Sequence, residues 1–198
     1  MAKDLIEQEE DGQTPLEDFS GLIPNIEKTR QALYSLEYKN INKARVKYLL
    51  KESVKTLTIS FLSQVHKDML GEVWEWAGKI REERMNLGIE PHQIRTELGQ
   101  LIKEIDIWEN KKIPAIEIAV RIHHRLAWIH PFNNGNGRFA RLICDIYLRS
   151  KGQSIIEWPT NPELRPKYLS ALKEADGGDF TSILELSKKY WNINIQKS

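Results

Sequence analysis

The sequence is short of the features that mark secreted, membrane-spanning and nucleic-acid-binding proteins. Its 198 residues include one cysteine, Cys144, which has no partner for a disulfide within the chain. No apolar run approaches the roughly 20 residues of a membrane helix, and the acidic first residues lack the apolar core of a signal peptide. Lysines and arginines number 29 against 28 acids, so no general basic field recruits nucleic acid. We therefore expect a cytoplasmic protein that binds neither membranes nor nucleic acid directly.

What the chain does have is the composition of a soluble helical domain. Hydrophobic residues make up 40% and charged residues 29% of it, which is typical of globular proteins. Residues 1–24 are polar and broken by glycine and proline, so we expect an extended arm there. Residues 25–55 have helical spacing and predict two short helices, over 26–38 and 41–50. Residues 56–198 then form the main domain.

The main domain reads as a series of amphipathic helices with one interruption. Thr58 is placed to cap a helix that carries Leu62, Val65 and His66 on one face. Residues 79–91 have a poor helical pattern, contain a glycine and end in a proline, which favours a hairpin or loop. Helical spacing resumes at residue 94 and continues to residue 191, with Gly152 as a stop signal. The predicted fold is mainly α with one small β-hairpin.

One segment combines the parts of an anion site, His130-Pro131-Phe132-Asn133-Asn134-Gly135-Asn136-Gly137-Arg138-Phe139-Ala140-Arg141. Gly135 and Gly137 allow a tight turn and a close approach of the backbone to a ligand. The following amides open a helix, and helix N-termini attract anions. Arg138 and Arg141 are three residues apart, on one side of the first turn, and guanidinium groups match phosphate oxygens. His130 could accept a proton near neutral pH. These features fit phosphoryl or nucleotidyl transfer, although a plain loop followed by a solvated helix face would look similar.

The segment resembles the signature of the Fic/Doc family, in which histidine and phenylalanine precede Gly-Asn-Gly-Arg and a second arginine. The stretches TPLEDFSGLIP, WEWAGKIREERMNLGIEPHQI and HHRLAWIHPF resemble the subgroup called mobile mystery protein B. The resemblance covers nearly the whole chain, from about residue 14 to 186. It implies a Fic-fold helical bundle with a β-hairpin flap, and residues 25–55 as an N-terminal, regulatory pair of helices.

The resemblance also implies roles for the signature residues. His130 would be the general base that deprotonates a target hydroxyl, Arg138 would hold the β-phosphate of a nucleotide, and Arg141 would meet the γ-phosphate. The anion hole around the α- and β-phosphates would consist of Gly135, Asn136 and Gly137. Most Fic proteins of this kind transfer AMP from ATP to a Ser, Thr or Tyr hydroxyl. The Doc branch has a lysine in place of the second glycine, so Gly137 favours AMP transfer.

Asn134 departs from the family pattern, in which an acidic residue at this position binds Mg²⁺. An asparagine offers one neutral carbonyl oxygen, which is a weaker ligand for a hard cation. The resemblance therefore implies ATP and Mg²⁺ as substrate and cofactor, with Asn134 as a weak magnesium ligand. The activity could also be weak or use a different donor.

Two further sites follow from the resemblance. The flap over the target peptide matches residues 79–91, where Leu87, Gly88 and Ile89 would contact the target, although an ordinary surface hairpin fits as well. Many Fic proteins are restrained by a helix whose glutamate pairs with the second arginine of the signature. The strict motif for that helix is absent here. Glu37 is a looser candidate, expected to face Arg141, and a surface glutamate is the alternative interpretation.

The function predicted from these observations is a protein adenylyltransferase acting on a hydroxyl side chain of a target protein. Two alternatives stay open: a Fic-fold phosphotransferase with another donor or Doc-like kinase chemistry, and a nucleotide-dependent binding or regulatory partner with little turnover. By analogy with the subgroup, a small helix-turn-helix protein is a possible partner. His123 and His124 suggest core packing rather than a zinc site, because no third ligand stands at a metal spacing.

Overall fold

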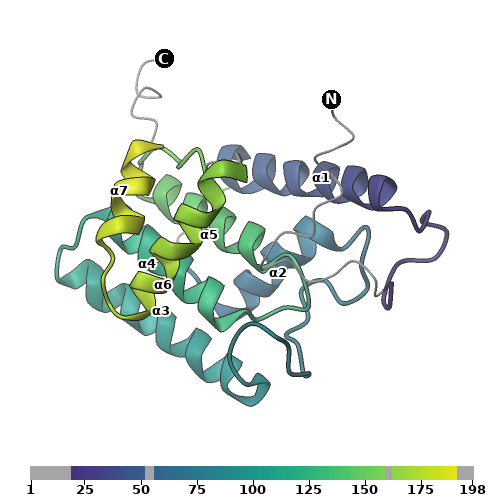
Figure 1. The fold of residues 1–198 in the computed structure, drawn as a ribbon, viewed down its shortest axis with the longest axis horizontal. Helices are drawn as coiled ribbons and strands as arrows, with labels where there is room; N and C mark the ends of the chain where they lie inside the picture. Colours follow the sequence, from purple (N-terminus) through teal and green to yellow (C-terminus); the bar gives the residue numbers. More distant parts are fainter. Residues whose placement is uncertain (1–18, 52–55, 159–161, 191–198) are drawn as a thin grey trace.

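The computed structural model describes residues 19–51, 56–158 and 162–190. Their helices are α1 (Arg30–Val46), α2 (Ile59–Leu70), α3 (Ile94–Asn110), α4 (Ala115–Ile129), α5 (Asn136–Ser150), α6 (Arg165–Asp176) and α7 (Thr181–Lys189). A π-helical turn, η1 (Lys47–Lys51), extends α1, and short 3₁₀ turns, η2 (Pro91–Gln93) and η3 (Pro162–Leu164), precede α3 and α6. The predicted mainly α fold is confirmed (Figure 1).

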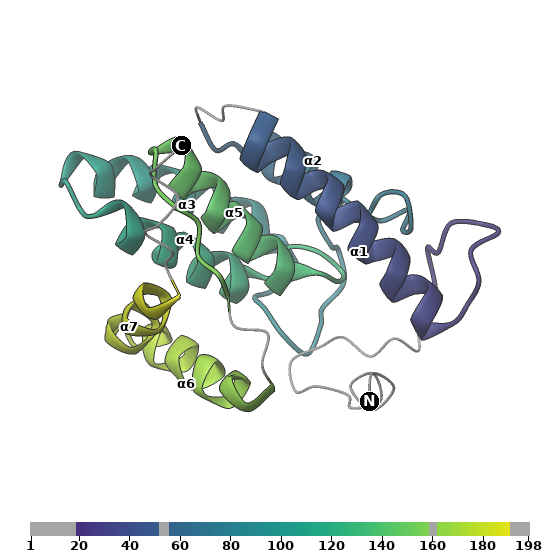
Figure 2. The same ribbon diagram turned by 90° about the horizontal axis from the view of Figure 1, so that it is seen from above.

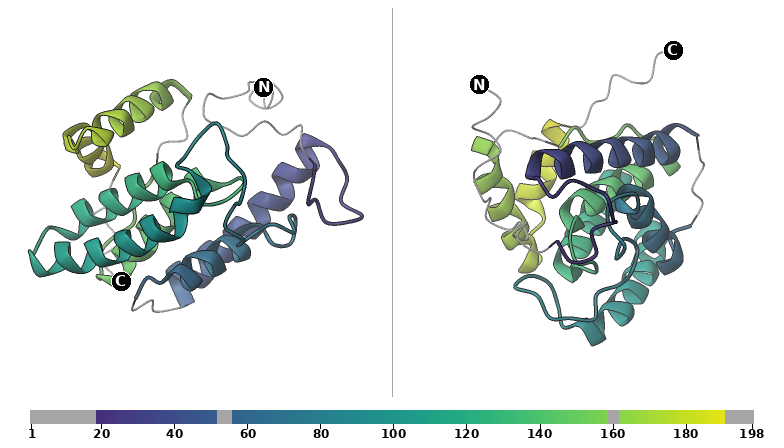
Figure 3. Two further views of the ribbon diagram at one scale, coloured as in Figure 1. Left: turned by 90° about the horizontal axis from the view of Figure 1, so that it is seen from below. Right: turned by 90° about the vertical axis from the view of Figure 1, so that its right-hand side faces the viewer.

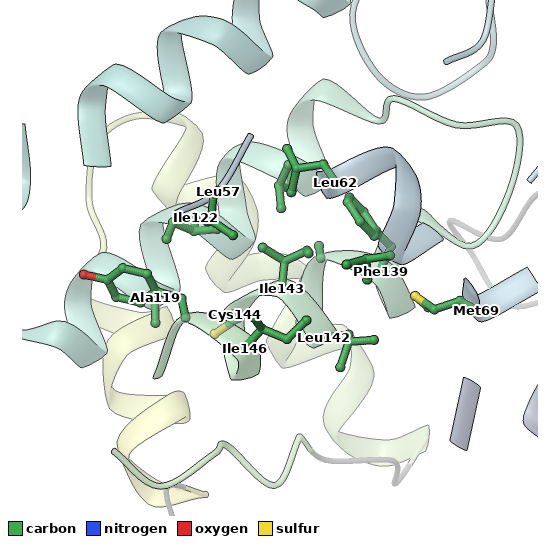
Figure 4. Packing of buried hydrophobic residues seen from close by; sticks show 14 of the residues in the cluster. Leu57, Leu62, Met69, Ala119, Ile122, Phe139, Leu142, Ile143, Cys144 and Ile146 are labelled. Atoms are coloured by element: carbon green, nitrogen blue, oxygen red, sulfur yellow. The ribbon is translucent and has the colours of Figure 1, made fainter. Parts of the chain in front are cut away.

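Helix α5 lies at the centre of the molecule. The pair α1 and α2 covers one side of it, and α3 and α4 cover the other, while α6 and α7 pack outside α4 (Figure 2). Figure 4 shows part of the buried cluster around α5, which includes Leu62, Met69, Ile122, Phe139 and Ile143. Because α4 and α5 are both buried along most of their length, the short connection between them is held in a fixed place.

The caps of several helices follow the expected chemistry. The Thr58 hydroxyl accepts a hydrogen bond from the Phe61 amide at 3.1 Å and starts α2, as predicted. Gly152 follows the end of α5 with a φ of 70°, the left-handed conformation in which glycine replaces a strained side chain. Helix α4 ends differently, because its last cap is a non-glycine residue, His130, with a φ of 52°.

One expectation about secondary structure was wrong, and the β-hairpin is not confirmed. The two short helices predicted for residues 25–55 are one continuous helix, α1, whose inner face carries the buried polar side chains Glu37 and Asn40. These polar positions interrupt the apolar stripe and so imitate a break between two helices. Residues 79–90, named here the 79–90 loop, form an irregular loop. An isolated antiparallel bridge joins Leu22 and Trp74, and no strand occurs in the described ranges.

Most of the predicted N-terminal arm, residues 1–18, and residues 52–55 lie outside the described residues. Within the described part of the chain, every helix is too short or too polar to traverse a lipid bilayer.

Candidate active site

The connection between α4 and α5, residues 130–135, is named here the α4–α5 loop. The side chain of Asn136 bridges this loop through two hydrogen bonds to the backbone of Phe132. The Asn136 Oδ1 accepts from the Phe132 amide at 2.9 Å, and its Nδ2 donates to the Phe132 carbonyl at 2.7 Å. Both residues are buried. The sequence predicts a phosphate-contacting role for Asn136. In the structure, both polar atoms of the Asn136 side chain bind the backbone of Phe132 within the loop. The backbone amide of Asn136 is therefore its one group available to contact a phosphate.

His66 of α2 supports the loop from below. The Gly78 amide donates to His66 Nδ1 at 2.9 Å, so the ring proton is on Nε2, which donates to the Asn134 carbonyl at 3.0 Å. The ring also stacks on Phe132, with centroids 3.8 Å apart. Burial lowers the pKa of His66 to about 3, because a charged imidazole would lose its hydration there. His66 is therefore a neutral structural residue in this site.

The outer side of the loop leads into the N-terminus of α5. The first helical hydrogen bond runs from the Phe139 amide to the Gly135 carbonyl, at 2.9 Å, and no side chain caps the helix. The amides of residues 136–138 therefore precede the first bond of the helix and give it positive potential. A Cβ at Gly137 would meet no atom within 4 Å, so the surface is open at this point. A Cβ at Gly135 would lie 2.8 Å from Leu70 Cδ1, and its φ is 76°.

His130 begins the α4–α5 loop, as the C-cap of α4. It is partly buried, and its Nδ1 lies 3.4 Å from the Ala127 carbonyl. A carbonyl can only accept, so Nδ1 carries the proton and Nε2 is left as the basic nitrogen. Burial lowers the pKa of His130 and outweighs the opposite effect of the Ala127 carbonyl, and the charge of Arg81 adds a smaller lowering effect. The imidazole is thus neutral, and able to accept a proton, at neutral pH.

Glu37 reaches the site from α1, but its partner differs from the expected one. The Glu37 carboxylate pairs with Arg138 at 2.6 Å, and not with Arg141. Its other oxygen accepts from the indole Nε1 of Trp74 at 2.7 Å. Glu37 is buried. The indole and the guanidinium hold the carboxylate from two sides, and the expected pairing of Glu37 with Arg141 is therefore corrected to Arg138.

Arg141 faces a different part of the molecule. It lies close enough to the Tyr168 hydroxyl of α6 for a hydrogen bond, and its charge acts on Tyr168 against the burial that raises the pKa of that hydroxyl to about 12. The Tyr168 hydroxyl is 2.8 Å from His123 Nε2. His123 is buried and stacks on Trp158, and burial lowers its pKa to about 3. The two arginines are thus held from opposite sides, Arg138 by α1 and Arg141 by α6.

The histidines of α4 pack within the protein, as expected. His124 Nε2 is 2.8 Å from an Asp176 carboxylate oxygen, and the ring lies edge-on to Phe180. Among the described residues, no group of three His, Cys, Asp or Glu side chains could hold a metal ion. Asn134 fits a magnesium ligand poorly, because its Oδ1 accepts from the Gly135 amide at 2.6 Å.

The 79–90 loop contacts the α4–α5 loop, because the Arg81 amide donates to the Pro131 carbonyl at 3.0 Å; the fold around them is drawn in Figure 3. Gly88 is in the left-handed region, and a Cβ there would collide with the Cβ of His130. Leu87 is exposed and Ile89 is half-buried. Of the three residues predicted for the flap, Gly88 contacts the catalytic candidate, and all three lie in a loop.

Sequence reasoning missed three residues that build this site. His66 lies 68 positions before the loop carbonyl that it holds, and its place on the apolar face of α2 was the available signal. Trp74 showed no sign of meeting Glu37. Arg81 donates from its Nε to the His130 carbonyl at 2.7 Å, and a lone arginine in a loop gave no indication of this.

The geometry defines a class of protein: a mainly α domain in which a short loop joins a neutral histidine to an uncapped helix N-terminus, and the first turns of that helix carry two arginines. Residues 56–148 match the model of the Fic/DOC family. The chain belongs to this family through those residues.

Among curated proteins, the chain is similar to "Protein adenylyltransferase fic-1" of Caenorhabditis briggsae, with 27% identity over 154 residues. This match covers 75% of the chain and 30% of that protein. It is also similar to "Protein adenylyltransferase Fic" of Drosophila willistoni, with 29% identity over 68% of the chain and 28% of that protein. The chain thus spans about a third of the length of these relatives.

Solved structures confirm the fold. A BepC effector protein from Bartonella tribocorum, with bound AMPPNP, has a TM-score of 0.70 at 20% identity, covering 85% of this chain and 90% of that one. Fic-1 (aa134–508) from C. elegans has a TM-score of 0.66 at 23% identity, covering 87% of this chain and 51% of that one.

Proposed function

We propose that the chain is a protein adenylyltransferase that transfers AMP from ATP to a Ser, Thr or Tyr hydroxyl of a target protein. The observation that carries the proposal is that one short loop joins the neutral His130 to the uncapped N-terminus of α5, whose first turn carries Arg138. The names of the curated relatives and the nucleotide in the BepC structure support it. Gly137 supports AMP transfer over the Doc-like reaction, because the position has no side chain.

In this mechanism, His130 Nε2 takes the proton of the target hydroxyl. The hydroxyl oxygen then attacks the α-phosphorus of ATP, a new P–O bond forms, and the bond to the bridging oxygen of the β-phosphate breaks, so that pyrophosphate leaves. The amides of residues 136–138 bind the α- and β-phosphates, with Arg138 on the β-phosphate and Arg141 on the γ-phosphate. These fixed donors stabilise the charge that shifts to the leaving group.

Magnesium enters the proposal as the companion of ATP, and the chain itself contributes little to it. The segment from His130 to Arg141 contains no carboxylate, and the Asn134 oxygen is engaged with the Gly135 amide. Mg²⁺ is commonly held by carboxylates together with substrate phosphates. We therefore assign the ion to the phosphates, with Asn134 at most a neutral contact, and no step above depends on it.

The proposed division of labour places regulation in residues 25–55 and catalysis in residues 56–198. Glu37 is the proposed inhibitory residue. Because it pairs with Arg138, it competes with the β-phosphate, while Arg141 stays with Tyr168. ATP and ADP would both have to displace Glu37, whereas AMP would not.

Measured nucleotide affinities test the proposed inhibition by Glu37 directly. In Glu37→Gly, affinity for ATP and for ADP should rise about tenfold, the size of an ordinary coupling between sites, and AMP affinity should stay unchanged. Glu72→Gln is the matched control, because Glu72 is an exposed carboxylate that pairs with Lys43. If ATP gained affinity while ADP did not, the assignment of Glu37 to the β-phosphate would be wrong.

The target would approach along the 79–90 loop, with Leu87, Gly88 and Ile89 as its contact residues, by adding an extended segment to the loop edge. A helix-turn-helix protein is a proposed regulatory partner, on the subgroup resemblance alone. The cytoplasm is the proposed compartment, because the one cysteine is free and buried.

The activity is tested with ATP labelled on the α-phosphate and, separately, on the γ-phosphate, in cell lysate with Mg²⁺. Protein-bound label should come from the α-position alone, and His130→Ala should reduce it about 10²- to 10⁴-fold, the range for loss of a general base. Nucleotide affinity should be retained in that variant. Glu37→Gly gives the unrestrained reference. Label from the γ-position alone would indicate kinase chemistry, and no label with intact ATP binding would indicate another donor or a binding role.

A further inference from the structure

Arg81 occupies an unusual position between the 79–90 loop and the candidate catalytic histidine. Arg81 is buried, with 3% of its surface exposed. The guanidinium donates to three backbone carbonyls: Nε to His130 at 2.7 Å, Nη1 to Glu83 at 2.8 Å and Nη2 to Ile89 at 2.5 Å. The Arg81 amide also donates to the Pro131 carbonyl at 3.0 Å. One residue thus touches both limbs of the 79–90 loop and the backbone on each side of the His130–Pro131 bond.

The chemistry of this contact is that of a planar clamp. A guanidinium presents five N–H donors in a fixed plane, and it can therefore hold three carbonyls in one geometry. A lysine ammonium is a compact charge on a flexible stem and cannot span them in the same way. Burying a cation is costly unless its donors are satisfied, and here carbonyl dipoles satisfy them.

The backbone held by this clamp is strained. His130 has a φ of 52°, in the left-handed region that non-glycine residues avoid. Such conformations persist only where the surrounding structure fixes them. The Arg81 bond to the His130 carbonyl is a direct restraint on that conformation. Gly88 packs against the Cβ of His130, and a Cβ at Gly88 would also lie 2.8 Å from Arg81 Nη2.

We propose that Arg81 is a positioning residue that couples the 79–90 loop to His130, so that the loop on which the target docks and the base that acts on the target share one geometry. This inference rests on the proposed function, in which His130 is the base and the loop receives the target. Arg81 touches neither the nucleotide site nor the target hydroxyl. It acts through the His130 carbonyl and through the carbonyls of Glu83 and Ile89.

The test compares Arg81→Met and Arg81→Lys with the control Arg84→Met, in the Glu37→Gly background. Arg84 belongs to the same loop, but its side chain is exposed and pairs with Glu90 at 3.1 Å. We expect both Arg81 variants to keep ATP affinity within about twofold and to lose about 10²-fold in kcat, the size of effect that a small misplacement of a catalytic group produces. Arg84→Met changes the same loop without touching the clamp, so it should lower kcat much less than either Arg81 variant.

A titration of the His130 imidazole by NMR separates positioning from a loss of folding and does not require activity. The Arg81 charge contributes to the lowered pKa of His130, so Arg81→Met should raise that pKa, and the acid limb of the pH–rate profile should move to higher pH. Arg81→Lys should keep the pKa closer to wild type and still lose kcat. The Ala127 carbonyl, which lies 3.4 Å from His130 Nδ1, does not titrate, and Gly88, which lies against the His130 Cβ, has no side chain.

The outcomes separate the two proposals. If the Glu37→Gly protein transfers no label, the adenylyltransferase proposal fails, while the His130 titration still tests the clamp. If transfer is present and the Arg81 variants match Arg84→Met in kcat, with an unshifted His130 titration, the coupling role of Arg81 is overturned. Should Arg81→Met fail to fold, Arg81→Lys carries the comparison.

Discussion

The side of the α4–α5 loop that faces the core, called here the inner side, differs in chemistry from the side at the N-terminus of α5, called here the outer side. On the inner side, the polar groups of Asn136 and His66 meet backbone partners, and the rings stack with their neighbours. On the outer side, the groups are charged or open: Arg138 pairs with a carboxylate from another helix, and Gly137 faces empty space. Neutral groups on the inner side fix the conformation of the loop, and charged or open groups on the outer side are available to bind an anion.

This contrast predicts that changes on the inner side affect stability and that changes on the outer side affect binding. The largest effect is expected for Asn136→Ala. Loss of the amide leaves a buried N–H and a buried C=O of Phe132 without their partner, which should lower the free energy of unfolding by about 3 kcal/mol. Urea denaturation measures it. The exposed Asn133→Ala is the matched control and should stay within about 0.5 kcal/mol of wild type. Equal stabilities of the two variants would contradict the bracing role of Asn136.

Gly135→Ala should follow, with a loss of about 2 kcal/mol from the left-handed backbone and from the approach of the new Cβ to Leu70. Thermal unfolding of the variant and the wild type at one pH gives the value. A Leu70→Ala, Gly135→Ala double variant separates the two causes, because it removes the contact and keeps the strain. No loss in the single variant would show that the conformation of Gly135 is not fixed.

The third expected effect is a pH dependence that belongs to the inner side. The pKa of His66 is lowered to about 3 in the folded protein from an ordinary value of 6.5. The unfolded chain therefore binds the proton first, and stability falls as the pH falls below 6.5 toward 3. The contribution of His66 approaches about 1.4 kcal/mol per pH unit within that window.

His66→Gln keeps a donor and an acceptor in place of the ring nitrogens and removes the titration, so the slope of stability against pH should become shallower. The exposed His92→Gln variant supplies the background. His123, whose pKa is also lowered to about 3, contributes to the slope in all the proteins. Identical slopes in the His66 and His92 variants would show that His66 is hydrated or charged in the folded state.

The smallest effect on stability is expected for Gly137→Ala, on the outer side. The new Cβ meets no protein atom, and alanine favours a helix over glycine, so the variant should be as stable as the wild type or up to about 1 kcal/mol more stable. Its affinity for ATP should nevertheless fall, because the Cβ occupies the opening that the phosphates use. Calorimetric titration in the Glu37→Gly background measures this. Loss of stability together with affinity would remove the distinction between the two sides.

The sequence predicts features that depend on neighbouring residues better than it predicts contacts between distant ones. Local signals, such as the hydroxyl of Thr58, the glycine at 152 and the spacing of apolar residues in α3 to α5, act over a few residues and were read correctly. Glu37 was identified as a candidate, but its partner was not, because the rotation of α1 decides whether it meets Arg138 or Arg141. That rotation depends on contacts with distant parts of the chain, such as Trp74, which lies 37 positions from Glu37.

The contacts of His66 and Arg81 with the α4–α5 loop could not be predicted, because they also join residues that are far apart in the sequence. A histidine on the apolar face of α2 looks like any core histidine until its distance to the Asn134 carbonyl is known. The irregular form of the 79–90 loop follows from Arg81, whose hydrogen bonds satisfy carbonyls that a hairpin would have paired across two strands.

The hydrogen bond from Trp74 to Glu37 has a spectroscopic consequence. The indole is buried, donates to a carboxylate and stacks on Trp76, with ring centroids 5.1 Å apart. Displacement of Glu37 by a phosphate would leave the indole with a different electrostatic neighbour, so its emission wavelength and the near-ultraviolet dichroism of the stacked pair should change. The difference between the wild type and Trp74→Phe isolates this signal, and the protein thereby carries its own optical reporter of whether α1 holds Arg138.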